Sequence, residues 1–184
     1  AAYLASSSVT YAPAVMANHY FKSEQWPKAF SCSLTAACEA LRLFTLSEAS
    51  LLFKQCELSL EASNENEKKE ERKEIPVGDT YPFYAGYTSY LIIEGDLDKA
   101  YSVLSIWEER AAKDGNQSQQ ISAILEKTQL DWQQSKYNEC RQELAEVLKY
   151  PDIQESPSFI ARVNAILAEV ERRSGNFTLA KTCC

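Results

Sequence analysis

Apolar residues recur along most of the chain three and four positions apart, which is the spacing of one face of an α-helix. Prolines, capping residues and glycines divide this pattern into segments of helical length. Pro13 opens the first segment and Pro27 the second, while Ser47 can cap a third. The sequence predicts about nine helices, over residues 13–23, 27–43, 47–60, 80–94, 97–112, 118–134, 137–149 and 157–174, with a short last one after Gly175.

A charged segment, residues 62–79, interrupts the helical pattern. Its middle, residues 64–74, contains no apolar residue and therefore cannot face a core. A helix there would place like charges one turn apart, for example Glu67 beside Glu71. We interpret the segment as a solvated, mobile loop within one domain that covers residues 1–184; the alternative is a charged binding element.

Similar residues recur forty positions apart in the second half of the chain. They are the turn residues Gly95, Ser135 and Gly175, the apolar or aromatic residues Leu97, Tyr137 and Phe177, and the small residues Ala100, Cys140 and Ala180. A fixed period of this length is typical of proteins built from stacked structural repeats. We therefore predict an all-α fold of antiparallel helix hairpins, stacked as an α-α superhelix.

The turns within this repeat resemble those of tetratricopeptide repeats. Residues 94–100 (EGDLDKA) and 174–180 (SGNFTLA) match the turn and the small residue that follows it, and residues 135–140 (SKYNEC) and 23–30 (SEQWPKAF) give two further copies. The sequence departs from the family in its forty-residue unit, where thirty-four is usual, and in having Asp131 and Glu171 where an aromatic residue is expected. The segment from His19 to Phe53 also resembles the repeat arms of signal-transduction ATPases and regulators.

The resemblance implies a protein that binds a partner peptide or domain on the concave face, which the first helix of each pair lines in this family. The corresponding positions in this chain are Asn18, Lys22, Ser89, Ile92, Ile93, Gln129, Trp132, Gln133, Glu169, Arg172 and Arg173. We therefore expect a non-enzymatic interaction scaffold. The alternative is a regulatory or sensor arm of a larger signalling ATPase or transcriptional regulator, in which another domain carries the chemistry.

Two features of this surface allow two interpretations each. Trp132, between Gln129 and Gln133, has the apolar and polar surroundings of an interface anchor, but it also suits a position in the interior. Arg172 and Arg173 suggest an acidic partner segment, although a solvated helix end explains the same pair. The sequence leaves both questions open.

Composition and charge support this picture. Five Gly and six Pro are too few for the many turns of a β-sandwich or barrel. A net charge of -7 argues against nucleic-acid binding, which needs clustered Lys and Arg. The sequence lacks the long apolar run of a membrane span and the features of a signal peptide, so we expect an intracellular protein that binds no membrane. It also reads as a fragment of a longer protein.

Candidate chemistry is sparse. His19 is the only histidine and no cysteine lies at a ligand-like spacing from it, so we expect no metal site. No phosphate loop, nucleophile elbow or paired-acid motif is present, and we predict neither catalytic residues nor a cofactor. The six cysteines suit free, mostly buried thiols, although the vicinal pair Cys183 and Cys184 is able in principle to sense oxidation or to bind a soft metal. Self-association through open solenoid ends is a further expectation.

Overall fold

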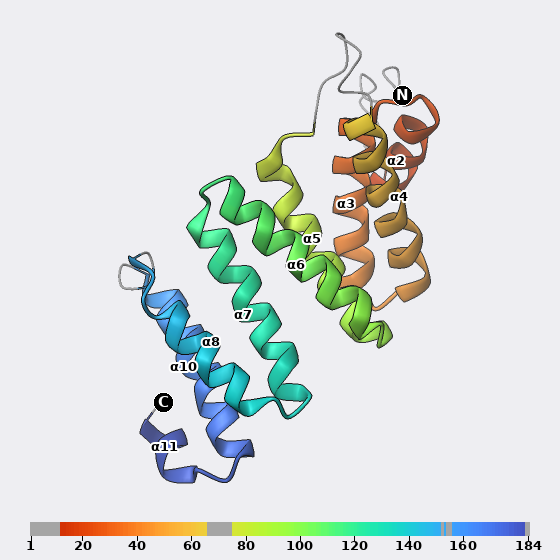
Figure 1. The fold of residues 1–184 in the computed structure, drawn as a ribbon. Coiled ribbons are helices and arrows are strands. Elements are labelled where there is room, and N and C mark those ends of the chain that lie inside the picture. Colours follow the sequence, from red (N-terminus) through yellow and green to blue (C-terminus); the bar gives the residue numbers. More distant parts are fainter. Residues whose placement is uncertain (1–11, 66–74, 152, 154–155, 183–184) are drawn as a thin grey trace. The chain divides into compact units, whose positions relative to one another are not determined.

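The computed structural model describes residues 12–65, 75–151, 153 and 156–182, and within these ranges the chain is all-α without a strand (Figure 1). The predicted all-α class is therefore confirmed. The helices are α2 (Pro13–Lys22), α3 (Trp26–Arg42), α4 (Leu46–Glu65), α5 (Val77–Glu94), α6 (Leu97–Lys113), α7 (Gln117–Gln133), α8 (Tyr137–Val147), α10 (Pro157–Arg173) and α11 (Phe177–Thr182).

Most helices begin and end within a few residues of the predicted positions. The largest differences border the charged segment, where α4 continues to Glu65 and α5 already begins at Val77. Two buried residues near these ends, Ser63 and Thr80, hold them against the core, and the Thr80 hydroxyl donates to the Val77 carbonyl at 2.7 Å. The two ends of the predicted loop are thus helical, while residues 66–74 lie outside the described residues.

Six helix-to-helix turns share one backbone geometry. In each, one residue has a left-handed backbone conformation with φ between 54° and 85°; these residues are Glu24, Phe44, Gly95, Gly115, Ser135 and Gly175. At the last turn, the N–H of Gly175 donates to the Arg172 carbonyl at 3.3 Å and the N–H of Asn176 donates to the Glu171 carbonyl at 2.8 Å. This pair of bonds is the Schellman pattern that closes helix C-termini.

The turns explain the forty-residue period of the sequence. From α6 onward these helices begin at residues 97, 117, 137, 157 and 177, so that successive starts are twenty residues apart. The recurring Gly95, Ser135 and Gly175 are the left-handed residues of alternate turns, a position at which a side chain is unfavourable. A regular superhelix built on this spacing stays a prediction.

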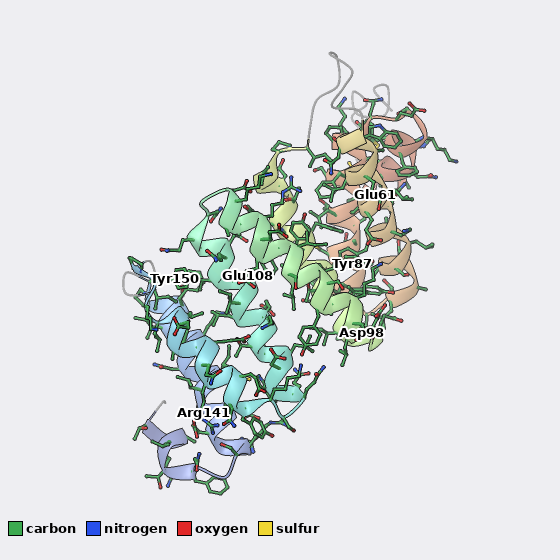
Figure 2. All side chains as sticks on the ribbon, in the orientation of Figure 1. Glu61, Tyr87, Asp98, Glu108, Arg141 and Tyr150 are labelled. Carbon is green, nitrogen blue, oxygen red and sulfur yellow. The ribbon has the colours of Figure 1, made fainter. Side chains whose placement is uncertain are left out.

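The chain divides into two compact units, which we describe separately; the single domain over residues 1–184 stays a prediction. Unit 1 extends to Ala100 and contains α2 to α5. Here α3 packs between α2 and α4, and α5 packs on α3 and α4. Its core is aromatic, with the ring centres of Phe53 and Phe83 each 5.3 Å from that of Tyr87, which Figure 2 labels.

Unit 2 begins at Tyr101 and contains most of α6 together with α7, α8, α10 and α11. α7, α8 and α10 pack on one another. They enclose an aliphatic core made of Ile121, Leu125, Cys140, Leu144, Val147, Ile153, Val163, Ile166 and Val170. Trp132 and Tyr150 pack against the edge of this core, and Figure 2 labels Tyr150.

Candidate partner-binding site

A groove of about 210 Å³ lies on unit 2 between α7 and α10. Six residues line it: Gln129 and Trp132 from α7, and Arg162, Ala165, Ile166 and Glu169 from α10. The α10 residues are three, four and seven positions apart, which places them on one face of that helix. The groove therefore combines an apolar floor with polar and charged walls.

Trp132 is half-buried and serves both roles that the sequence left open. Its indole packs against the unit 2 core and also lines the groove. The Arg173 guanidinium lies over the ring, 4.3 Å from its centre, a cation–π contact that holds the indole in place. Leu130, two positions away and therefore on another side of the same helix, is fully buried.

Ion pairs fix the charged side chains at the groove. Glu169 accepts hydrogen bonds from Arg172 Nε at 2.8 Å and from Arg173 Nε at 2.7 Å. These bonds, first that of Arg172 and then that of Arg173, lower the pKa of Glu169 to about 2. On the other side, Arg162 donates to Glu126 at 2.9 Å. In the immediate surroundings of the groove, three arginines thus outnumber two glutamates.

A buried carboxylate anchors the C-terminal end of α10 beside the groove. Glu171 accepts from Arg141 Nε at 2.6 Å, from Arg141 Nη2 at 3.0 Å and from the Asn176 amide at 2.7 Å. The Arg141 hydrogen bonds, followed by that of Asn176, lower the pKa of Glu171 to about 2. Because Arg141 also donates to the Ser174 hydroxyl at 2.7 Å, α8 is tied to the α10–α11 turn (Figure 2).

A second buried carboxylate occupies the equivalent place on α7. Asp131 accepts from the Tyr101 hydroxyl at 2.6 Å and from Lys136 Nζ at 2.9 Å. These hydrogen bonds, first that of Asp131, raise the pKa of Lys136, while burial and then the bond to Asp131 raise that of Tyr101. Asp131 and Glu171 are forty residues apart, as are their partners Tyr101 and Arg141. The two departures from the tetratricopeptide pattern are therefore one repeated structural feature.

The structure brings together most of the predicted partner-binding residues of unit 2. Gln129, Trp132 and Glu169 line the groove, and Arg172 and Arg173 are joined to it through Glu169. Gln133 is exposed at the end of α7 and does not line the groove.

The predicted residues of unit 1 fall in two places. Asn18 and Lys22 line a separate groove between α2 and α4. Ser89 and Ile93 lie exposed on α5, which packs on α3. In unit 1, α2 contacts α4 and α3 contacts α5, so that alternate helices form two rows. One row contains α2 and α4, and the other contains α3 and α5. The predicted positions on α2 and on α5 therefore lie in different rows, because the single helix α4 separates the first hairpin from α5.

Sequence reasoning missed the α10 wall of the unit 2 groove, formed by Arg162, Ala165 and Ile166. A signal for it exists in the sequence, since Arg162, Ile166 and Glu169 share the helical face of the predicted Arg173. The resemblance does not reach this wall, because Arg162 and Ile166 lie about three and two helical turns before the turn at residues 174–180.

The cysteines and the remaining side chains add no reactive centre to this site. Cys56 and Cys140 are free and buried as predicted, whereas Cys38 is exposed, and Cys183 and Cys184 lie outside the described residues. Burial raises the pKa of Cys140 to about 11 and that of Cys56 further. In the described part of the chain, no group of three or more His, Cys, Asp or Glu side chains is placed to hold a metal ion. None of the described helices combines the length and the apolar character needed to cross a membrane.

Comparisons with known proteins give no further assignment. A scan against protein-family models, a search of curated proteins and a search of solved structures each found no match to this chain.

Proposed function

We propose that the protein is a non-enzymatic interaction module, a tetratricopeptide-like stack of helix pairs that holds a peptide segment of another protein in the groove between α7 and α10. The observation that carries this proposal is Trp132, a half-buried indole that lines a groove and is held in place by Arg173. Tryptophan and arginine are among the residues enriched where protein interfaces gain most of their binding energy.

The lining of the groove indicates the chemistry of the peptide. Ala165 and Ile166 continue the apolar surface of Trp132, so an apolar side chain of the peptide fits there. Arg162 and Arg173 stand at the same groove, and Glu169 uses only the Nε of Arg173. A carboxylate of the peptide can therefore bond to the remaining guanidinium nitrogens. We propose an acidic peptide with an apolar residue next to its Asp or Glu.

Rigidity of the groove favours binding by this mechanism. Trp132 is packed between the core and Arg173, and the ends of α7 and α10 are fixed by the Asp131 and Glu171 networks. Little side-chain freedom is then lost when a peptide binds, which reduces the entropic cost of association.

A peptide-display selection on the full chain tests the proposal. We expect enrichment of peptides that carry Asp or Glu beside an apolar residue. Trp132→Ala then weakens the selected peptide roughly thirtyfold, the equivalent of about 2 kcal/mol for an interface anchor. Phe177→Ala is the matched control, because this aromatic side chain is 64% exposed on α11 and outside the groove.

Two further results complete the test. Arg173→Gln removes a charge without removing core contacts of the indole, so it should reduce the preference for acidic peptides more than the affinity for their amide analogues. If circular dichroism shows folded protein and no peptide is enriched, or if Trp132→Ala and Phe177→Ala behave alike, the groove is not the binding site. The regulatory-arm alternative then gains weight.

A further inference from the structure

A second and larger groove, of about 580 Å³, lies on unit 1 between α2 and α4. Two helical faces line it, with Ala14, Asn18, Phe21 and Lys22 from α2 and Glu48, Leu51, Leu52 and Gln55 from α4. Its volume is in the usual range of sites that enclose a ligand or an anchoring segment. It belongs to a different unit from the Trp132 groove, and the inference drawn from it does not depend on the function proposed above.

The apolar side chains of the α2/α4 groove form its floor, and one of them is left largely uncovered by the rest of the chain. Leu51 is 74% exposed although it lies on the groove-facing side of α4. Phe21, which also lines the groove, is positioned by an edge-to-face contact with Trp26, at 5.5 Å between ring centres. A prepositioned aromatic ring and an exposed leucine together form an apolar surface that a second apolar face can cover.

The two charged side chains of the groove lie toward its opposite ends. α2 and α4 each form an antiparallel hairpin with α3, so they run in the same direction. Glu48 is in the first turn of α4, just after the end of α3, whereas Lys22 ends α2, just before the start of α3.

Both charges are available to a partner. Among the described residues, neither the Lys22 ammonium nor the Glu48 carboxylate forms an ion pair or a side-chain hydrogen bond, and each is exposed. Lys22, in the last turn of α2, and Glu48, in the first turn of α4, each interact favourably with the dipole of their own helix. This interaction leaves the outward side of both charged groups open. In the Trp132 groove, by contrast, Glu169 already binds both neighbouring arginines.

The groove suits a helix better than an extended strand. Its walls are helix side chains, so no open row of backbone N–H and C=O groups is present to pair with a strand. Gln55 already accepts a hydrogen bond from the Ser33 hydroxyl at 3.0 Å, which leaves few polar groups for an extended backbone. A helix satisfies its own backbone and presents an apolar stripe to a groove of this kind.

From these observations we propose that the α2/α4 groove binds an amphipathic helix that carries an acidic and a basic residue on either side of an apolar pair. The acidic residue pairs with Lys22, the basic residue pairs with Glu48, and the apolar pair covers Leu51 and Phe21. The two charges select the partner by sign, while the apolar floor supplies most of the affinity.

Three synthetic helical peptides of about sixteen residues test the proposal on the full chain. The first has Glu, then two leucines three and four positions later, then Lys seven positions after the Glu, so that all four side chains share one face. The other two replace the charged pair by two Glu or by two Lys. Each like-charged peptide meets one attractive and one repulsive charge in the groove, whichever way it docks.

We expect the Glu/Lys peptide to bind roughly tenfold more tightly than either like-charged peptide at low salt, and this advantage to shrink as salt screens the charges. Lys22→Glu should shift the preference to the Lys/Lys peptide, and Glu48→Lys should shift it to the Glu/Glu peptide. Leu51→Ala should weaken all three peptides alike. It removes an exposed side chain, so the fold, checked by circular dichroism, is retained.

Trp132→Ala should leave all three affinities unchanged, because it belongs to the other groove. The proposal is wrong if folded wild-type protein binds none of the peptides up to about 1 mM, or if the three bind equally. It is also wrong if the two charge reversals fail to shift the preference. Any of these results leaves the function proposed for the Trp132 groove untouched.

Discussion

The pair formed by Arg141 and Glu171 offers the strictest test of how unit 2 is held together. Glu171 is 8% exposed in its side chain and Arg141 is 30% exposed, and two hydrogen bonds of 2.6 and 3.0 Å join them. Arg141 lies on α8 and Glu171 near the end of α10, so the pair connects two helices that are thirty residues apart in sequence. Substitution of either partner leaves the other charge largely enclosed.

The expected magnitude follows from this enclosure. Removal of one partner of a buried, hydrogen-bonded ion pair destabilises a protein by about 3 kcal/mol or more, mainly because the remaining charge is unpaired. We expect about 3 kcal/mol for Arg141→Ala, which strands the more buried charge, and about 2 kcal/mol for Glu171→Ala, since Arg141 retains some contact with water and with Ser174. In the double variant the losses should not add, and a coupling of about 2 kcal/mol should remain.

The assay is urea unfolding of the full chain, followed by tryptophan fluorescence in a Trp26→Phe background, so that the remaining indoles, Trp107 and Trp132, report on unit 2. The matched control is the pair Glu146 and Lys149, whose side chains are both 68% exposed. Its disruption should change the free energy of unfolding by no more than about 0.5 kcal/mol.

Acid should act on the same pair. The pKa of Glu171 is lowered to about 2 in the folded chain from an ordinary value of 4.5. Its carboxylate therefore contributes its full stabilisation above about pH 4.5, and this contribution is lost as the pH falls toward 2. Glu171→Gln should be less stable at neutral pH and should lose less stability than the wild type over this interval. The reasoning is refuted if the Arg141 and Glu171 losses simply add, or if they are as small as that of the exposed control pair.

Further predictions concern the turns and the thiols. Ser135 and Gly175 both have a left-handed backbone, which glycine adopts more easily than other residues. Ser135→Gly should therefore raise the free energy of unfolding by about 0.5 to 1 kcal/mol, and Gly175→Ala should lower it by about 1 kcal/mol. Urea unfolding measures both changes, and a reversed sign at either position contradicts the turn geometry. In native protein at pH 8, a thiol reagent should label exposed Cys38 before Cys56 and Cys140, although burial raises the pKa of the Cys38 thiol and slows its reaction. Cys56 and Cys140 should react only on unfolding. Mass spectrometry of the labelled peptides shows the order, and early labelling of Cys140 contradicts its burial.

The sequence predicts the helices of this chain well because their signals are local. Prolines at helix starts and left-handed residues at helix ends act within one turn, so Pro13, Pro157 and Gly175 mark boundaries that the structure retains within a residue or two. The forty-residue period is also visible in sequence, because every second turn repeats the same backbone requirement at Gly95, Ser135 and Gly175.

Features that depend on pairing between helices could not be predicted in the same way. Asp131 and Glu171 stand out in the sequence as acids on an apolar face, but their partners Tyr101 and Arg141 are thirty residues away and become neighbours only when the helices pack. Alternate helices of unit 1 form two rows, so the row of a helix depends on how many helices precede it. The family pattern assigns both Lys22 and Ser89 to the first helix of a pair. The single extra helix α4 nevertheless places these two residues in different rows.

The interaction of a peptide with Trp132 can be observed directly by nuclear magnetic resonance of the three indole N–H groups. Trp107 is buried and its indole donates to Gln119 at 3.2 Å, and Trp26 lies in unit 1, so both serve as internal references. When the selected acidic peptide is added to the full chain, the Trp132 indole signal should shift in proportion to occupancy while the other two stay fixed. An unmoved Trp132 signal at saturation, or equal shifts at all three indoles, would contradict the proposed binding site.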